Sequence, residues 1–109
     1  MDRSLSQAEL VENLDRWVGA EVAVRVVSGE ELIAVFRGRL GERVADRNPT
    51  LFWPLGELAH GLEAPGVFLH PEKFQEAAAH EGMFVVELRQ GGVVLNIRRT
   101  EAERRLTPG

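Results

Sequence analysis

The sequence predicts a single α+β domain, in which a small bent antiparallel β-barrel or sheet is flanked by two helices. Three observations predict this class. Valine-rich stretches alternate with a period of two, which is typical of strands. Glycine-containing turns separate these stretches, as they do in antiparallel hairpins. Helix signals occur at residues 7–18 and again at 71–81, the second set inserted before the last hairpin.

The first helix is expected over residues 7–18. Ser6 and Glu9 have the spacing of a capping box, in which each side chain accepts a hydrogen bond from the backbone amide of the other residue. Apolar residues then recur on one helical stripe, and Gly19 is a natural end. A helix with such a face must pack on a core, where we expect Trp17 as an anchor.

The strands follow from alternation and turns. Residues 20–28 and 31–40 predict a long hairpin around Gly29, with Gly38 marking a bend. Residues 42–49 are polar and predict a loop. Short strands are expected at 51–53 and 67–69, the first ended by Pro54. Residues 83–89 and 93–99 predict a closing hairpin around the pair Gly91 and Gly92.

The second helix is expected over residues 71–81. Pro71 suits the first turn of a helix, Glu72 suits its positive N-terminal end, and Gly82 suits its C-terminal end.

Composition limits the class of protein. The chain has 109 residues, 44% of them hydrophobic and 28% charged, with no cysteine and a net charge of −4. These values predict one domain over residues 1–99 and a polar tail over 100–109. The lack of cysteine excludes disulfides and thiolate metal sites. No apolar run matches a membrane span or a signal peptide, so we expect a cytoplasmic protein without a membrane partner.

Two stretches combine valines and glycines in a distinctive order. In the stretch 14–40 these are Val18, Gly19, Val22, Val24, Val26, Gly29, Gly38, Arg39 and Leu40, and in the stretch 92–98 they are Gly92, Val93, Val94, Ile97 and Arg98. The first stretch is similar to the first motif of the Sm-like proteins, a family within the SH3-like barrels, and the second is similar to that family's closing Ile-Arg-Gly segment. The sequence departs from the family where Arg99 follows Arg98 in place of glycine. The resemblance implies a ring-shaped homo-oligomer that binds single-stranded RNA.

Arginine clusters are the candidate nucleic-acid-binding residues. Apart from Lys73, every residue of the Lys and Arg set is arginine. One cluster lies on or just after the second predicted strand, and another lies near the end of the chain. The candidates are Arg37, Arg39, Arg43, Arg47, Arg98 and Arg99. If the two clusters met on one surface, they would attract phosphates. Interspersed acidic residues favour the alternative of ordinary solvated faces.

Phe52 and Trp53 are the candidate interface residues. Neighbours on a strand point to opposite sides, so one of the two is expected to be exposed or to lie in a subunit contact. We therefore expect a non-catalytic binding or assembly module that self-associates through a strand edge, as a homo-oligomer. The Sm-like RNA-binding ring is the alternative function.

Catalytic motifs are missing from the sequence. There is no nucleophile elbow and no phosphate-binding loop, so we expect no enzymatic activity, no cofactor and no metal. A second alternative is a small metal-dependent enzyme around His70, Glu76 and His80. That reading places Glu76 and His80 on one face of the second helix.

Overall fold

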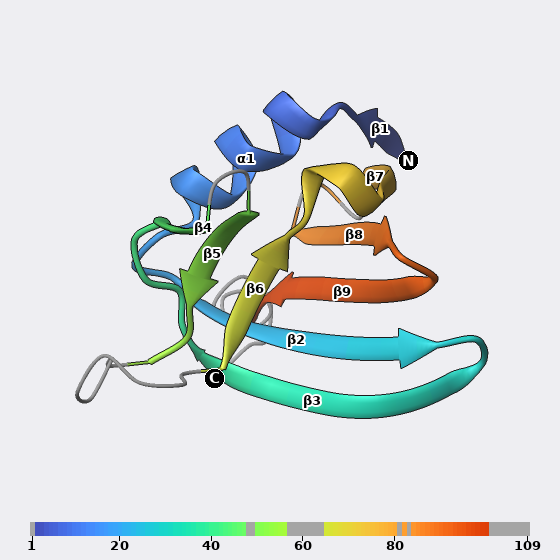
Figure 1. Cartoon of the computed structure of the whole chain (residues 1–109). Coiled ribbons are helices and arrows are strands. Elements are labelled where there is room, and N and C mark those ends of the chain that lie inside the picture. Colours follow the sequence, from blue (N-terminus) through green and yellow to red (C-terminus); the bar gives the residue numbers. More distant parts are fainter. Residues whose placement is uncertain (1, 48–49, 57–64, 81, 83, 101–109) are drawn as a thin grey trace.

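The computed structural model describes residues 2–47, 50–56, 65–80, 82 and 84–100. These described residues form mostly antiparallel sheet with one α-helix (Figure 1). The elements are β1 (Arg3–Leu5), α1 (Gln7–Arg16), β2 (Glu21–Ser28), β3 (Glu31–Arg39), β4 (Val44–Arg47), β5 (Thr50–Pro54), β6 (Gly66–Leu69), the short 3₁₀ helix η2 (Pro71–Lys73), β7 (Phe74–His80), β8 (Val85–Gln90) and β9 (Val93–Arg99).

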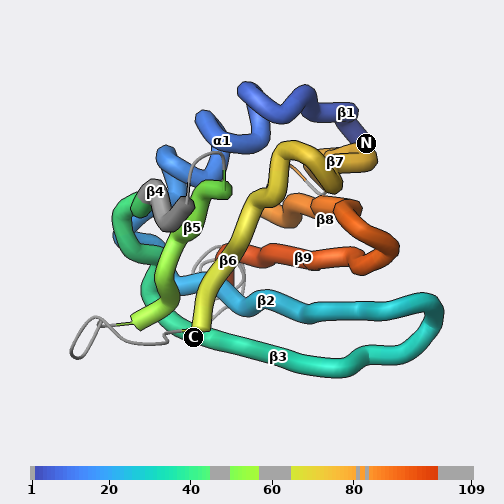
Figure 2. The backbone as a smooth tube through the Cα atoms, viewed as in Figure 1, coloured from blue at the N-terminus to red at the C-terminus, as the bar shows by residue number. Residues whose placement is uncertain are grey.

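The strands form two antiparallel sheets. The larger has the order β1-β7-β8-β9-β2-β3, and the smaller has the order β4-β5-β6. The backbone tube shows the small sheet crossing in front of the large one, with α1 along one margin (Figure 2). The predicted antiparallel sheet is confirmed, but the predicted barrel is wrong. Among the described strands the large sheet ends in two edges, β1 and β3, and does not close on itself.

Glycines allow the two sheets to meet. The chain leaves β3 and forms a bridge between Leu40 and Leu55, and the Gly41 amide donates to the Pro54 carbonyl at 2.7 Å. Beside it, the Gly56 amide donates to the Arg39 carbonyl at 2.8 Å. These contacts link the sheets by backbone hydrogen bonds at one corner, without the continuous ladder that a barrel needs.

The core lies between the two sheets and α1. Trp53 is its largest fully buried side chain. It is surrounded by Leu10, Leu14, Val22, Val24, Leu40, Val67, Leu69, Val86, Leu88 and Ile97. Burial of this apolar surface is the main term that stabilises the fold. Trp17 is 5% exposed and belongs to the same core, as predicted.

The first helix is confirmed, with a shorter C-terminal end. The Ser6 hydroxyl accepts from the Glu9 amide at 3.1 Å, and the Glu9 carboxylate accepts from the Ser6 amide at 2.9 Å. Both halves of the predicted capping box are therefore present. The helix ends at Arg16, and a turn leads to Gly19, whose φ of 94° favours glycine.

Most of the predicted strands are confirmed. The long hairpin β2–β3, the short strands β5 and β6, and the closing hairpin β8–β9 all occur near their expected bounds. The predicted loop at 42–49 is partly wrong, because 44–47 form β4 and pair with β5. Apart from Thr100, the predicted C-terminal tail lies outside the described residues.

The predicted second helix over 71–81 is wrong. Only Pro71–Lys73 are helical, and Phe74–His80 form β7 between β1 and β8. Ala77 and Ala79 point into the core at 2% and 1% exposure, whereas Ala78 and His80, which alternate with them, are only half-buried. Pairing on both sides outweighs the helix propensity of its three alanines.

Candidate functional site

The candidate functional site is the free edge of the large sheet. β3 has nine residues and pairs with β2 along one side. No other described strand pairs with its second side, and Figures 1 and 2 show it as the outermost strand. The opposite edge, β1, has only three residues. A long free edge offers a row of amides and carbonyls to another strand.

Large apolar side chains are exposed along this edge. The exposed fractions are 50% for Leu32, 58% for Ile33, 55% for Val35 and 36% for Phe36. Phe36 is paired with Val24, which faces the core, whereas Val35 is paired with Arg25 on the outer face. Apolar residues are therefore exposed on both faces of one edge strand. We call these four residues the β3 patch.

The sequence reasoning missed the β3 patch. The sequence of Glu31–Arg39 does contain a signal for it. The four apolar residues do not alternate with polar ones, as they would in a strand with one solvent-exposed face. A β-bulge between Val26 and Val27 shifts the register of β3, and this irregularity places Leu32 opposite Val27. Lysine and proline, which commonly protect edges, are missing from β3.

The structure brings some of the predicted arginines together. Ala23 pairs with Arg37 on one side and with Arg98 on the other, so these arginines lie in one row across β3, β2 and β9. Arg25 lies next to this row, and Arg39 is two residues from Arg37 on the same face. A hollow of about 360 Å³ is lined in part by Arg25, Arg37 and Arg98. Arg25 is the member of this group that the sequence reasoning missed.

The other predicted arginines lie elsewhere. Arg43 pairs with Asp15 of α1 at 3.2 Å. Arg99 points to the opposite face from Arg98, as strand alternation requires, and its guanidinium carbon lies 6.0 Å from the centre of the Trp17 ring. The Arg47 side chain is outside the described part. The predicted single basic surface therefore forms only from Arg37, Arg39 and Arg98, with Arg25 added.

The two predicted interface aromatics point to opposite sides. Trp53 is fully buried, and its indole nitrogen donates to the Asp15 carboxylate at 3.0 Å. Trp53 is therefore a core residue and is not available to a partner. Phe52 is half-buried and stacks on Phe68 with ring centres 4.3 Å apart. A subunit contact through Phe52 stays a prediction.

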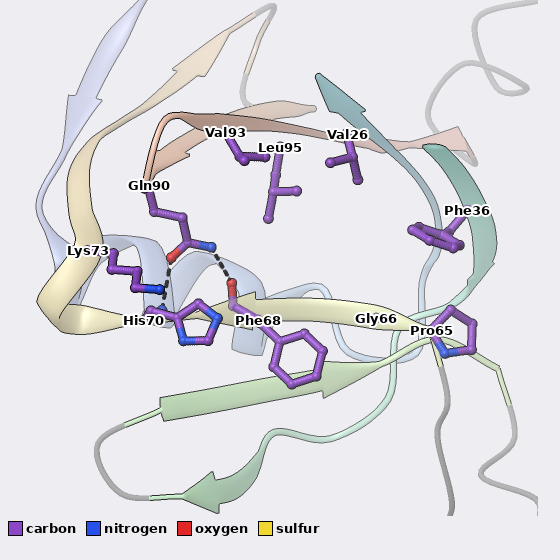
Figure 3. Close-up of a pocket in the computed structure, with 11 residues that line it drawn as sticks. Val26, Phe36, Pro65, Gly66, Phe68, His70, Lys73, Gln90, Val93 and Leu95 are labelled. Atoms are coloured by element: carbon purple, nitrogen blue, oxygen red, sulfur yellow. Dashed lines mark hydrogen bonds between the residues drawn. The ribbon is translucent and has the colours of Figure 1, made fainter. Parts of the chain in front are cut away.

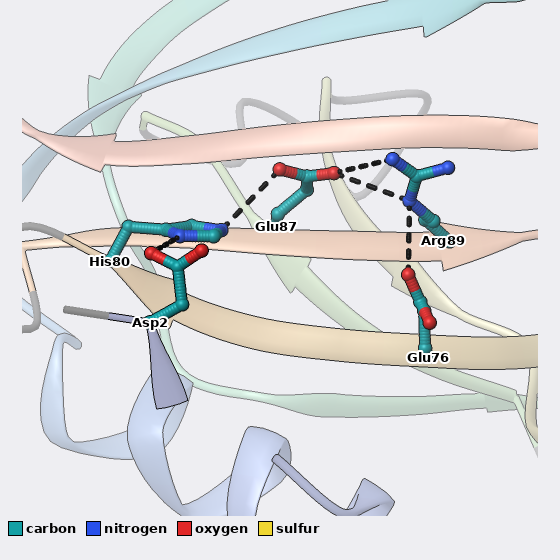
Figure 4. A network of polar contacts seen from close by, with 5 residues as sticks. All are labelled: Asp2, Glu76, His80, Glu87 and Arg89. Atoms are coloured by element: carbon teal, nitrogen blue, oxygen red, sulfur yellow. Dashed lines mark hydrogen bonds and ion pairs between the residues drawn. The ribbon is translucent and has the colours of Figure 1, made fainter. Parts of the chain in front are cut away.

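A network of charged residues lies on the outer face at the other end of the sheet (Figure 4). His80 contacts Asp2 at 2.7 Å and Glu87 at 3.4 Å. Arg89 contacts Glu87 at 3.1 Å and Glu76 at 3.3 Å. The hydrogen bond that His80 Nδ1 donates to the Asp2 carboxylate raises the pKa of the imidazole, and the same bond lowers the pKa of Asp2. Each of these five side chains forms an ion pair with another member of the network, although the buried His80 Nε2 has no hydrogen-bond partner.

The structure does not bring together His70, Glu76 and His80, the three residues of the alternative metal site. Glu76 and His80 lie on β7, and the helix expected to join them is not present. His70 precedes η2 and contacts Thr50 and Gln90, away from the network. Within the described ranges, no group of three or more potential ligands has the arrangement of a metal site.

No helix of the described chain is both long and apolar enough to cross a lipid bilayer. Comparison of the chain with protein-family models, with curated proteins and with solved structures found no match in any of the three.

Proposed function

We propose that this protein is a non-catalytic assembly module that self-associates through the free edge of β3. One observation carries the proposal, namely a nine-residue edge strand with four large apolar side chains exposed over both of its faces. Pairing with a second copy would satisfy the free backbone groups and remove the β3 patch from water. A two-fold axis brings the same surface of each copy together and so closes the contact.

The charges on β3 favour antiparallel pairing of two copies. In a two-fold pair centred on Ala34, Ile33 of one copy lies opposite Val35 of the other, and Glu31 lies level with Arg37 along the strand. The bulge turns Leu32 to the outer face while Phe36 stays on the inner face, so an apolar side chain lies on each face at that level. An apolar cross-strand pair in the middle and opposite charges at the ends both favour an antiparallel ladder. A parallel pair would instead place Glu31 beside Glu31 and Arg37 beside Arg37.

Cysteine crosslinking tests this register directly, because the chain has no cysteine of its own. In an Ala34→Cys variant, the two new cysteines would be directly opposite, with Cα atoms about 4.5–5.5 Å apart, which suits a disulfide. We expect a crosslinked dimer under mild oxidation. Arg39→Cys is the matched control, because its two copies would be ten strand positions apart, or roughly 34 Å.

Charge substitution tests the β3 patch independently. The double change Ile33→Lys with Val35→Lys places four like charges at the centre of the proposed interface, and we expect monomers by light scattering. Phe84→Lys is the control, because Phe84 is 38% exposed but lies away from β3. Wild-type protein that stays monomeric at high concentration, or equal crosslinking of both cysteine variants, would refute the proposal.

Single-stranded RNA binding is the second candidate function. It is favoured by the row of Arg37 and Arg98 across Ala23, with Arg25 beside it. Such a group can contact successive phosphates, and its affinity should fall steeply with salt. The test is titration of a fluorescent oligouridine, with Arg37→Gln expected to weaken binding and Arg43→Gln, on the helix side, to leave it unchanged. No binding at low salt would remove this candidate.

A further inference from the structure

A hollow of about 400 Å³ opens between the inner face of the large sheet and the small sheet (Figure 3). Its wall is formed by Phe36 of β3, Phe68 of β6, and Val93 and Leu95 of β9. The outer-face arginines are on the other side of the sheet, so this hollow is separate from the basic group. Its volume is within the range of about 300–1,000 Å³ that small-molecule sites occupy.

One end of the hollow is polar. Gln90 is 7% exposed, and its side-chain oxygen accepts from the His70 amide at 2.8 Å while its nitrogen donates to the Phe68 carbonyl at 2.6 Å. These two bonds fix Gln90 and hold β6 beside the turn between β8 and β9. The His70 ring stacks parallel to Phe68, with ring centres 6.0 Å apart. The polar end is therefore held in place by hydrogen bonds and stacking.

Lys73 supplies a positive charge at this polar end. Figure 3 shows its side chain turned towards His70 and Gln90. Its stem passes close to Gly91, where an added Cβ would lie 3.4 Å from Lys73 Cδ. No aspartate or glutamate of the described chain lines the hollow, and none forms an ion pair with Lys73. It is also the only lysine in the sequence.

We propose that this hollow binds an unbranched aliphatic carboxylate, with its chain against the apolar wall and its carboxylate on Lys73. A neutral apolar molecule would gain nothing from the positive charge of Lys73, which is exposed at the polar end. A phosphate group would need more donors than one lysine and one imidazole provide. An apolar chain ending in one negative charge matches both the apolar wall and the polar end of the hollow. Of the β3 patch, only Phe36 lines this hollow.

The test is isothermal titration calorimetry of the full chain with hexanoate, octanoate and decanoate. Each added methylene should strengthen binding about fourfold, the ratio given by about 0.8 kcal/mol per buried CH₂. Lys73→Met should weaken octanoate binding about tenfold. Arg39→Met removes a cation on the outer face and should change nothing. Octanol, which has the same chain and no charge, should bind the wild-type protein more weakly than octanoate.

A variant that fills the hollow tests whether the carboxylate binds there. Val93 is half-buried in the wall, and Val93→Trp should abolish binding by occupying the hollow. Circular dichroism of Val93→Trp would check that it folds, and Lys73→Met provides an independent result at an exposed position. Affinity that does not depend on chain length, or octanoate binding that Lys73→Met leaves unchanged, would overturn the proposal. Binding should persist in the monomeric variant Ile33→Lys with Val35→Lys, which separates this site from self-association.

Discussion

Asp15 links helix α1 to the buried indole of Trp53, and its removal should destabilise the protein more than its exposure suggests. One carboxylate oxygen accepts from Trp53 Nε1 at 3.0 Å and from Arg43 Nε at 3.3 Å. The other lies 3.2 Å from the second guanidinium nitrogen of Arg43. The Asp15 and Arg43 side chains are 37% and 40% exposed, whereas Trp53 is fully buried. The Asp15–Trp53 hydrogen bond and the Asp15–Arg43 ion pair therefore contribute different amounts to the free energy of unfolding.

The magnitudes follow from burial. Asp15→Ala leaves a buried indole N–H without its acceptor, which costs about 1–3 kcal/mol, and partial access of water favours the lower half of that range. Arg43→Ala removes only an exposed ion pair, worth about 0–1 kcal/mol. Asp15→Asn keeps an oxygen for the indole and loses only the charge. We expect the loss of stability to be largest for Asp15→Ala, with Asp15→Asn and Arg43→Ala both smaller.

Thermal and urea unfolding followed by tryptophan fluorescence would measure these differences. For a domain of this size, 1 kcal/mol lowers Tm by roughly 4–8 °C. Protein concentration must be held constant, because self-association adds to the apparent stability. A double-mutant cycle with Trp53→Phe should show a coupling of about 1 kcal/mol or more. Equal losses for Asp15→Ala and Arg43→Ala, with no coupling to Trp53, would refute the reasoning.

Two further predictions concern His80 and Gly66. Folding raises the pKa of His80, so its contribution to stability is complete below its ordinary value of 6.5 and is lost as the pH rises through the raised value. The lowered pKa of Asp2 acts in the opposite sense, and its contribution is lost as the pH falls through a value below 3.8. NMR titration should show a lower His80 pKa in Asp2→Asn, and an unchanged value would contradict the assignment. Gly66→Ala should destabilise by about 1–3 kcal/mol because its Cβ would clash with the Trp53 carbonyl oxygen, whereas Gly38→Ala, with its nearest contact at 3.3 Å, should cost less in the same unfolding assay.

The elements that sequence reasoning recovered are those with local signals. The capping box at Ser6 and Glu9 defines the start of α1, and the pair Gly91 and Gly92, both at positive φ, defines the closing hairpin. These features depend on a few neighbouring residues. The core position of Trp17 followed from helical periodicity in the same way.

The failures involve partners distant in sequence. β7 was mistaken for a helix because its alanines hide the alternation, and only pairing with β1 and β8 makes it a strand. The arginine group was predicted only in part, because Arg37 and Arg98 meet across a third strand, β2. The sequence also does not show that the strands divide into two sheets. Among the described strands, β4, β5 and β6 form ladders only with one another, and the large sheet therefore stays open.

The apolar sequence of β3 does not suit its position at an edge, and self-association would cover this edge. Hydrogen exchange can test this explanation. Its apolar residues suit a strand covered on both faces, yet the isolated chain leaves it at an edge. In the proposed pair, the β3 amides that point away from β2 become hydrogen-bonded. Their exchange should slow as protein concentration rises, whereas amides of β8, which has strands on both sides, should not change. Exchange in β3 that is independent of concentration, at concentrations where light scattering detects dimers, would mean that the copies meet through another surface.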